Sequence, residues 1–222
     1  IFVRDIEYIG LKLILTLKNF SKKIIAYCVD NPFVSIDFIR WKLCKPTLKY
    51  YDLIVFQQFN RIMQAKRHNL KKTLFVFPPY DKKAHRPPKI SIKEKKKLQN
   101  DIIFIGTWFP ERGKFIKNLY DKGLKIKIYG TRWNKDKYFD QIKNNIVLGH
   151  VTGPLYSKLI YCSKIALGLV SKENLDEITR RSIEIPAIGT LLCAKRTKTH
   201  KKVFVENKEA IFFKDAKECV QK

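Results

Sequence analysis

Nine short apolar runs alternate with longer amphipathic stretches along most of the chain. Each run has five to seven residues, and most are apolar at successive positions rather than at every second one. That pattern indicates parallel strands buried on both faces, because helical crossovers cover both sides of such a sheet. The sequence therefore predicts an α/β fold with right-handed crossovers. The expected strands are 23–29, 52–56, 73–77, 101–106, 125–130, 145–149, 164–170, 190–194 and 209–213.

The stretch PERGKFIKNLYDKG carries the clearest helical pattern. Pro110 suits the first turn of a helix, where its missing N–H is no loss, and Gly123 suits the position past the end. Phe115, Ile116 and Leu119 recur at helical spacing and predict one apolar face. A helix here joins the fourth and fifth apolar runs into a strand–helix–strand unit.

One segment, FPPYDKKAHRPPKISIKEKKKLQN at 77–100, breaks the alternation. It holds four prolines and a dense lysine run, which is typical of a linker followed by a solvated segment. Three of the expected strands precede it and six follow it. We therefore expect two Rossmann-like domains: a short, partial N-terminal domain over 1–85, a linker over 86–100, and a C-terminal domain over 101–222.

The chain is strongly basic, with a net charge of +26, yet only ten of its 46 basic residues are arginines. Nucleic-acid sites that clamp phosphates or read bases rely on arginine forks, so a lysine excess indicates a generally basic surface instead. Such a surface favours anionic membranes or acidic polymers, and compositional drift without any partner explains it equally well. No RRM, KH or helix-turn-helix pattern occurs, so we expect no specific nucleic-acid partner.

Neither the cysteines nor the histidines indicate a metal site or a disulfide framework. The five cysteines form no C-x-x-C pair, and three lie in or beside apolar runs, which indicates core residues in a reducing compartment. The four histidines lack metal-ligand spacing, and no D-x-D pair is present to hold a cation. We therefore expect no metal and no cofactor. The fairly apolar first twenty residues are interrupted by charges and do not predict a membrane span.

The segment TRRSIEIPAIGT places charges beside an apolar face. Thr179 is a suitable N-cap, and the propensities that follow predict a short helix over 180–188. Arg181 and Glu184 are three residues apart, so they share one face of that helix. A plain surface ion pair, worth under about 1 kcal/mol, is the alternative.

The position of this segment favours a binding role for its charges. It follows a buried strand and a polar loop, so it falls at the carboxyl edge of the sheet, where open parallel sheets bind ligands. There Glu184 can accept both hydroxyls of a ribose, and Arg181 can neutralise a phosphate. Gly189 and Thr190, just beyond, offer a close backbone approach.

A second candidate loop, IGTWFPERGKF, joins an expected strand to the helix at Pro110. Gly106 and Thr107 end the strand, and the following helix N-terminus attracts phosphate. Arg112 in the first helical turn can reach a diphosphate. The motif is neither G-x-G-x-x-G nor a Walker loop, so a plain strand–loop–helix turn with an exposed Arg112 is the favoured alternative.

Two further strand ends carry polar or aromatic residues. Asp30, in AYCVDNPF, directly follows a strand, where it acts either as a functional acid or as ordinary turn chemistry. His150 and Val151 follow another strand and can frame a nucleotide base. Trp133 can stack on that base, although core packing is the preferred interpretation.

Against this background the run RSIEIPAIGTLLCAKRTKTH with VFVENKEAIFFKD, within 181–215, resembles the C-terminal signature of the spore-protein CgeB-like glycosyltransferases. DIIFIGTWFPERGKFI resembles the opening strand and arginine of the same domain. FPPYDKKAHRPP resembles its interdomain linker, and AYCVDNPF a strand end of its N-terminal domain. The resemblance runs from about residue 24 to the end.

The resemblance implies a GT-B fold, in which two Rossmann-like domains carry the acceptor and the nucleotide-sugar and no metal is obligatory. Glu184 matches the glutamate expected on the donor ribose, and Arg112 and Arg181 would balance the diphosphate. Related retaining enzymes have another glutamate eight residues before Glu184, where this chain has Asp176. Asp176 and Asp30 are therefore the candidate catalytic residues.

Together these features predict a metal-independent glycosyltransferase that moves a sugar from a nucleotide-sugar to a glycan, lipid or protein acceptor. We expect a cytoplasmic protein that can lie peripherally on the anionic inner surface of the membrane. Both ends look incomplete beside the family, so we expect a truncated N-terminal domain. The alternatives are a basic nucleic-acid-binding α/β protein and a degenerate, non-catalytic GT-B protein.

Overall fold

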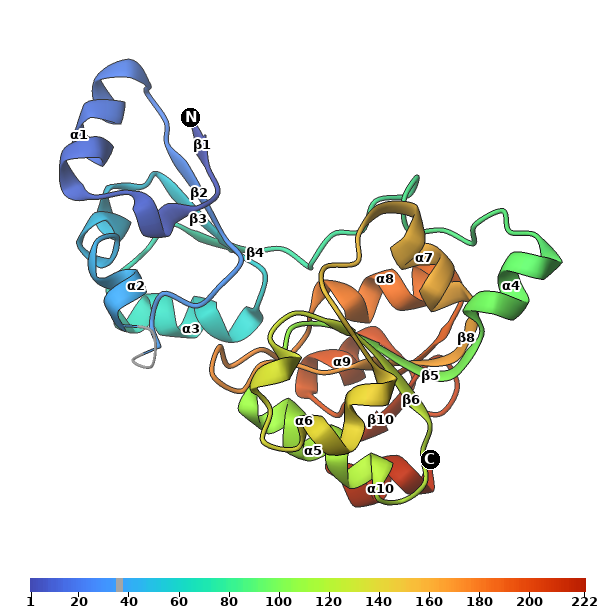
Figure 1. Ribbon diagram of the computed structural model, residues 1–222. Coiled ribbons are helices and arrows are strands. Elements are labelled where there is room, and N and C mark those ends of the chain that lie inside the picture. Colours follow the sequence, from blue (N-terminus) through green and yellow to red (C-terminus); the bar gives the residue numbers. More distant parts are fainter. Residues whose placement is uncertain (35–37) are drawn as a thin grey trace. The chain divides into compact units, whose positions relative to one another are not determined.

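The computed structural model describes residues 1–34 and 38–222, which form two compact units (Figure 1). The first unit comprises Ile1–Pro78 together with Ser171–Asp176, and the second comprises Pro79–Val170 with Glu177–Lys222. These units differ from the expected domains in two respects. The first unit ends at Pro78 rather than at residue 85, and it includes a short segment from late in the sequence.

The first unit is built on a parallel four-stranded sheet in the order β1-β2-β3-β4. Its strands are β1 (Phe2–Val3), β2 (Ile25–Cys28), β3 (Leu53–Phe56) and β4 (Thr73–Phe75), and its helices are α1 (Leu11–Phe20), α2 (Phe38–Lys42) and α3 (Phe59–Arg67). Three of these strands were expected. The pattern missed β1, because a two-residue strand is too short to produce any periodicity.

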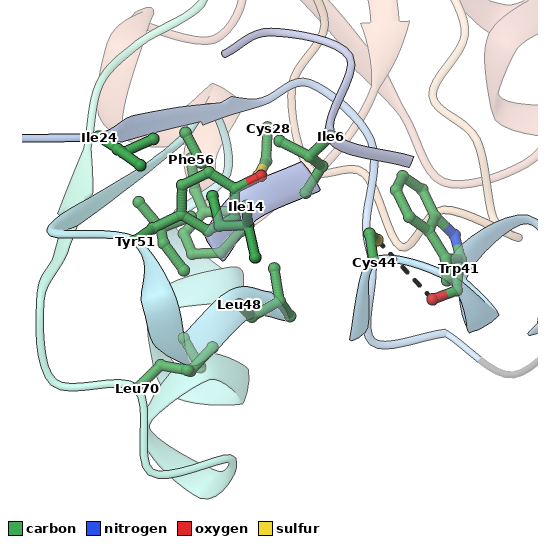
Figure 2. Packing of buried hydrophobic residues seen from close by; sticks show 13 residues of the cluster. Ile6, Ile14, Ile24, Cys28, Trp41, Cys44, Leu48, Tyr51, Phe56 and Leu70 are labelled. Atoms are coloured by element: carbon green, nitrogen blue, oxygen red, sulfur yellow. Dashed lines mark hydrogen bonds between the residues drawn. The ribbon is translucent and has the colours of Figure 1, made fainter. Parts of the chain in front are cut away.

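One face of this sheet carries the core of the first unit. Figure 2 shows Ile14 of α1, Leu48 of the 3-10 helix Lys45–Tyr50, and Phe56 of β3 in one cluster with other buried side chains. Beside them the Cys44 thiol donates to the carbonyl of Trp41 at 3.7 Å. All five cysteines of the chain are buried free thiols, as expected for core residues. Burial raises the pKa of Cys44 to about 11, so this thiol stays protonated.

The second unit contains a parallel six-stranded sheet in the order β10-β9-β8-β5-β6-β7. The chain begins in the middle at β5, builds outward to β7, then returns to β8 beside β5 and builds outward on the other side. This is the doubly wound order of a Rossmann fold, with its switch point between β5 and β8. The strands are β5 (Asn100–Ile105), β6 (Ile126–Gly130), β7 (Ile146–Leu148), β8 (Ser163–Gly168), β9 (Leu191–Lys195) and β10 (Ile211–Phe213).

Helices cover both faces of the second sheet. One core cluster joins α7 and α8 to the strands, and a separate cluster joins α5, α6 and α10 to them. Ile103 and Ile105 of β5 enter the first cluster and Phe104 enters the second, as alternation along a strand requires. None of the described helices is long and apolar enough to cross a membrane. The helices are α4 (Ile92–Leu98), α5 (Pro110–Tyr120), α6 (Phe139–Ile142), α7 (Gly153–Tyr161), α8 (Arg180–Ile188), α9 (Lys198–Val203) and α10 (Ala216–Gln221).

Candidate functional site

A buried arginine lies at the switch point of the second sheet, between the loops that follow β5 and β8. Arg112 is 8% exposed, although the sequence favoured an exposed side chain. Its Nη1 donates to the carbonyl of Thr107, after β5, at 2.8 Å, and its Nη2 donates to the carbonyl of Leu169, after β8, at 3.3 Å. Arg112 therefore joins the two loops that flank the switch point, and its guanidinium also lies over the ring of Phe109. Its role toward a diphosphate stays a prediction.

The loop at Gly106 is held by close backbone packing. The carbonyl of Gly106 accepts from Nε1 of Trp133 at 2.9 Å, and the Gly106 N–H donates to the carbonyl of Tyr129 at 2.8 Å. A Cβ at Gly130 would lie only 1.9 Å from that Gly106 oxygen, so the two segments touch because residue 130 has no side chain. Trp133 is fully buried, which confirms the preference for core packing over base stacking.

Helix α8 begins and ends where the sequence placed it, with Thr179 at its N-cap. The Thr179 N–H donates to Ser182 Oγ at 3.3 Å. Ser182 Oγ also contacts Nε2 of the fully buried His200 at 2.8 Å, while His200 Nδ1 contacts the carbonyl of Lys195 at 2.7 Å. Since a carbonyl only accepts, Nδ1 carries the proton and Nε2 accepts from Ser182. This pair fixes the first turn of α8, from which Arg181 projects.

Arg181 and Glu184 both lie on α8 but differ in how far their polar groups are satisfied. Arg181 is half-buried, and its Nε has no hydrogen-bond partner among the described residues. Glu184 is 9% exposed, and its Oε2 accepts from the hydroxyl of Tyr156 on α7 at 2.8 Å. Burial raises the pKa of Tyr156, and the nearby Glu184 carboxylate raises it further. The hydroxyl therefore stays protonated and donates. The other carboxylate oxygen, Oε1, lies 3.7 Å from Nε2 of His85.

The other predicted donor-binding residues lie at separate places in the second unit. Gly189 is exposed with φ 94° and caps α8, whereas the buried Thr190 hydroxyl donates to the carbonyl of Ile160 at 2.8 Å. Thr190 therefore has a structural partner. His150 is exposed, and Val151 packs at the margin of a core cluster. No contact joins either residue to Glu184 in the described part of the chain, so their base-side role stays a prediction.

The two predicted catalytic acids lie together in the first unit. Asn174 connects them, because its Nδ2 donates to Asp176 Oδ1 at 2.8 Å and to Asp30 Oδ1 at 3.4 Å. Asp176 also pairs with the fully buried Arg61 at 2.7 Å, and Asp30 with Arg40 at 2.7 Å. Burial lowers the pKa of Arg61, and the Asp176 carboxylate opposes that shift. Both acids thus have structural partners, and their catalytic role stays a prediction.

A small polar hollow of about 150 Å³ lies beside Asp30, at the carboxyl edge of the first sheet. Most of its lining residues come directly after β1 and β2. They include carboxylates, guanidinium groups and an indole. Burial lowers the pKa of Arg40, but its two carboxylate partners, Glu7 and Asp30, raise it by more. The net result is a raised pKa. The lining residues are Arg4, Asp5, Ile6, Glu7, Cys28, Val29, Asp30, Arg40 and Trp41.

Sequence reasoning missed three polar residues of these clusters. Tyr156 and His85 were unmarked because their importance comes from their contact with Glu184, which lies 28 residues or more away along the chain. Asn174 was likewise unmarked. The linker run FPPYDKKAHRPP, which contains His85 and resembles the family's interdomain linker, was the available signal for that residue. Within residues 1–34 and 38–222, no three His, Cys, Asp or Glu side chains gather to hold a metal ion, and metal independence stays a prediction.

The fold and the site together define the class of the protein: two Rossmann-like units with a doubly wound second sheet, the GT-B arrangement of elements. A family model described as glycosyl transferase-like matches residues 112–222, half of the chain. The chain therefore belongs to the glycosyl transferase-like family. The matched segment contains Arg112, Arg181 and Glu184. No curated protein shows significant sequence similarity to the chain.

Solved structures share this fold at low sequence identity. Anabaena Alr3699/HepE in complex with UDP-glucose has a TM-score of 0.69 at 10% identity, over 95% of this chain and 65% of its own. Sucrose-phosphate synthase from Thermosynechococcus elongatus has a TM-score of 0.66 at 12% identity, and the match covers 93% of this chain and 59% of the synthase. An α,α-trehalose-phosphate synthase (UDP-forming) from Burkholderia xenovorans has a TM-score of 0.60 at 9% identity, and the match covers 99% of this chain and 63% of that synthase. The chain thus spans less than two thirds of these relatives.

Proposed function

We propose that the chain transfers a sugar from a nucleotide-sugar donor to a glycan, lipid or protein acceptor without a metal ion. The observation that carries the proposal is α8, whose first turns present Arg181 and Glu184 inside the segment matched by the glycosyl transferase-like family. The structural neighbours crystallised with UDP-glucose or named as UDP-forming synthases support a nucleotide-sugar donor. The signature at 181–215 further supports membership in the CgeB-like group.

The second unit supplies the chemistry that such a donor needs. As the sugar leaves, negative charge grows on the diphosphate, and fixed positive groups in a preorganised site stabilise that charge. Arg181 has an unpartnered Nε, and the helices that begin at Pro110 and Arg180 contribute the positive ends of their dipoles. Glu184 keeps Oε1 available for a ribose hydroxyl while Tyr156 holds Oε2.

Nucleotide binding to matched variants tests the proposal. We expect UDP or GDP to raise the melting temperature of the wild-type chain, because a ligand that binds only the folded state stabilises it. Arg181→Ala should weaken binding about tenfold, the effect of losing one charge-assisted hydrogen bond. Arg180→Ala is the matched control, since Arg180 is the exposed neighbour on the same helix, and its affinity should stay at the wild-type value.

Two results would contradict the donor site. Equal affinity for UDP in the Arg181→Ala and Glu184→Gln variants and in the wild type would exclude α8 as the binding element. Unchanged stability with every nucleoside diphosphate and nucleotide-sugar would favour a degenerate, non-catalytic protein. A salt-dependent gel shift with short RNA, without a nucleotide response, would favour the nucleic-acid-binding alternative.

For the acceptor we propose the polar hollow of the first unit. Carboxylates accept from sugar hydroxyls and an indole packs on a sugar ring, and Asp30 and Trp41 supply one of each. We retain Asp30 as the proposed acid on this side. Asp30→Asn should then lower turnover while leaving UDP affinity unchanged, as isothermal titration and a transfer assay would show.

We also propose a cytoplasmic location with peripheral contact to anionic membranes through α4. This helix buries none of its residues, carries four lysines and leaves Ile92 78% exposed. Its Lys95 also lines a hollow of about 540 Å³ with Lys125, Lys127 and Lys164, large enough for a phosphate headgroup. Several lysines near a surface favour anionic lipid by about 1 kcal/mol each.

Vesicle sedimentation tests this contact. Binding to phosphatidylserine vesicles should fall with added salt and be weak to phosphatidylcholine alone. Replacing three of the four lysines of α4 (Lys95, Lys96 and Lys97) by Gln should weaken this binding. Replacing those of α9 (Lys198, Lys201 and Lys202) by Gln is the control of equal charge. Salt-independent binding, or equal losses in the two triple variants, would argue against this contact.

A further inference from the structure

The proline-rich linker is attached to the second unit beside α7 and α8. Ser157 Oγ on α7 donates to the carbonyl of Ala84 at 2.6 Å. A Cβ added at Gly189, at the end of α8, would lie 3.5 Å from Cγ of Pro87. His85 lies between these two contacts, so the chain on both sides of it is held against the helices that carry Tyr156 and Glu184.

A tight turn fixes the protonation pattern of the His85 ring. The backbone N–H of Asp81 donates to His85 Nδ1 at 2.9 Å, and the His85 N–H donates to the Asp81 carbonyl at 2.7 Å. Asp81 Oδ1 accepts from the N–H groups of Lys83 and Ala84, which closes the turn. Because Nδ1 accepts a hydrogen bond, the neutral ring carries its proton on Nε2. The Asp81 turn therefore aims an N–H donor at Glu184.

Donor and acceptor face one another without making a hydrogen bond. His85 Nε2 lies 3.7 Å from Glu184 Oε1, beyond the range of an N–H···O bond. The side chains are 19% and 11% exposed, so solvent or a ligand can reach both. Glu184 Oε2 is already engaged by Tyr156, which leaves Oε1 as the free acceptor and fixes the carboxylate plane.

The separation suits one hydroxyl group. An oxygen about 2.8 Å from both atoms would form an ordinary hydrogen bond with each. A hydroxyl is the simplest group that can accept from Nε2 and donate to Oε1 at once, because it has one proton and two lone pairs. A keto oxygen would leave Glu184 unsatisfied, and an ammonium group would leave His85 unsatisfied.

We propose that His85 and Glu184 together bind one ribose hydroxyl of the nucleotide, with His85 donating to that hydroxyl and Glu184 accepting from it. The inference rests on the proposed function and assigns the linker a direct role in donor recognition. The linker is then part of the binding site rather than only a connection, and the Asp81 turn and Tyr156 are positioning elements for its two polar groups.

Deoxynucleotides test this assignment by isothermal titration on the full chain. His85→Ala should weaken UDP binding about three- to tenfold, the usual range for one neutral hydrogen bond. The wild type should lose more affinity than this toward whichever of 2′-deoxy-UDP and 3′-deoxy-UDP lacks the bound hydroxyl, because both hydrogen bonds are then removed. The variant should show a smaller loss toward that analogue, because only the Glu184 hydrogen bond remains to be lost. His85→Gln, whose amide can still donate, should recover part of the UDP affinity. His68→Ala is the control, since His68 is exposed in the first unit.

The outcomes separate this inference from the proposed function. If the wild type binds UDP but His85→Ala binds it equally well, the assignment is overturned while the donor site stands. If His85→Ala weakens UDP and both deoxy analogues by the same factor, His85 acts only through the fold, and the assignment is again overturned. If the wild type binds neither UDP nor GDP, the proposed function fails and this inference fails with it.

Discussion

The two sheets of the molecule use the same parallel strands but differ in where the chain reverses direction. The first sheet follows chain order from β1 to β4, so every right-handed crossover moves the same way and stays on one face. Its core cluster accordingly takes Ala26 and Cys28 from β2 and Ile54 and Phe56 from β3, although Val55 on the other face of β3 is buried as well. The second sheet reverses between β5 and β8, and Ile103, Phe104 and Ile105 are all buried there.

The reversal also positions the residues of the candidate site. At the switch point the crossovers from β5 and β8 leave on opposite faces, and the loops that follow the two strands separate. Arg112 joins those loops through their carbonyls, and α8 brings Arg181 and Glu184 to the same edge. The first sheet has no reversal among its described strands, and its polar hollow is lined by the ion-paired side chains Glu7, Asp30 and Arg40. Similar strand sequences therefore acquire different surroundings through connectivity.

The largest effect should come from filling the contact between β6 and the loop after β5. A Cβ at residue 130 would lie 1.9 Å from the oxygen and 2.7 Å from the carbon of the Gly106 carbonyl, so Gly130→Ala must move backbone. We expect the second unit to lose on the order of 4 kcal/mol, together with UDP binding, while the first unit is unaffected. Urea unfolding followed by hydrogen exchange would resolve the two units.

A glycine of different surroundings provides the control for that substitution. Gly123 has φ 81°, but a Cβ added there would have nothing within 4 Å, so Gly123→Ala adds backbone strain without a clash. Its cost should be about 1 kcal/mol. Equal losses of unfolding free energy in the two variants would mean that the close packing at Gly106 does not stabilise the second unit.

A smaller effect is expected from Asp176→Asn in the first unit. Arg61 is fully buried and needs a compensating carboxylate, because an unmatched buried charge is costly. Asparagine keeps an oxygen for the hydrogen bond but loses the charge, so we expect a loss of about 2 to 3 kcal/mol in the first unit. Asp140→Asn is the control: its pair with Lys143 is exposed and should matter by less than about 0.5 kcal/mol.

The same variant separates a structural from a catalytic Asp176. A structural role predicts lower stability with UDP affinity unchanged in the folded protein. Turnover that disappears while the unfolding midpoint stays at the wild-type value would instead show that Asp176 acts in catalysis and that Arg61 tolerates its loss.

Local pattern was sufficient to predict most of the fold. All nine expected strands are present, and the helix at 180–188 has the expected ends because a capping residue and a C-terminal glycine mark them in the sequence. The attachment of Ser171–Asp176 to the first unit was not predictable, since it depends on Asn31 and Arg61, far away along the chain.

The residues of the candidate site also divide into those that local sequence could predict and those that depend on distant contacts. Arg181 and Glu184 could be selected because helical spacing puts them on one face of a helix at a sheet edge. The burial of Arg112 could not be predicted, because its Nη1 and Nη2 atoms donate to backbone carbonyls, which have no sequence signature. Tyr156 could not be selected for a related reason: its local sequence is ordinary, and it becomes notable only through its contact with Glu184. His85 lies in the linker run that carries the resemblance, but its role likewise depends on its position beside Glu184.

The smallest predicted effect is a pH dependence confined to the second unit. Burial lowers the pKa of His200, while the Lys195 carbonyl and Glu177 oppose that shift. The unfolded chain therefore binds the proton more readily than the folded one. The stabilisation is complete above the ordinary histidine pKa of about 6.5 and is lost as the pH falls, with a slope of at most about 1.4 kcal/mol per pH unit. The first unit should lack this component.

Thermal unfolding of wild type and His200→Gln between neutral and mildly acidic pH measures this component. Glutamine does not titrate, so the variant should start less stable, having lost the Ser182 contact, and should then lose less stability than the wild type as the pH falls. Nucleotide affinity should decline in parallel in the wild type, because the Ser182–His200 pair fixes the first turn of α8, next to Arg181. Parallel pH curves for the two proteins would mean that folding leaves the pKa of His200 unchanged, which would contradict the predicted pH dependence.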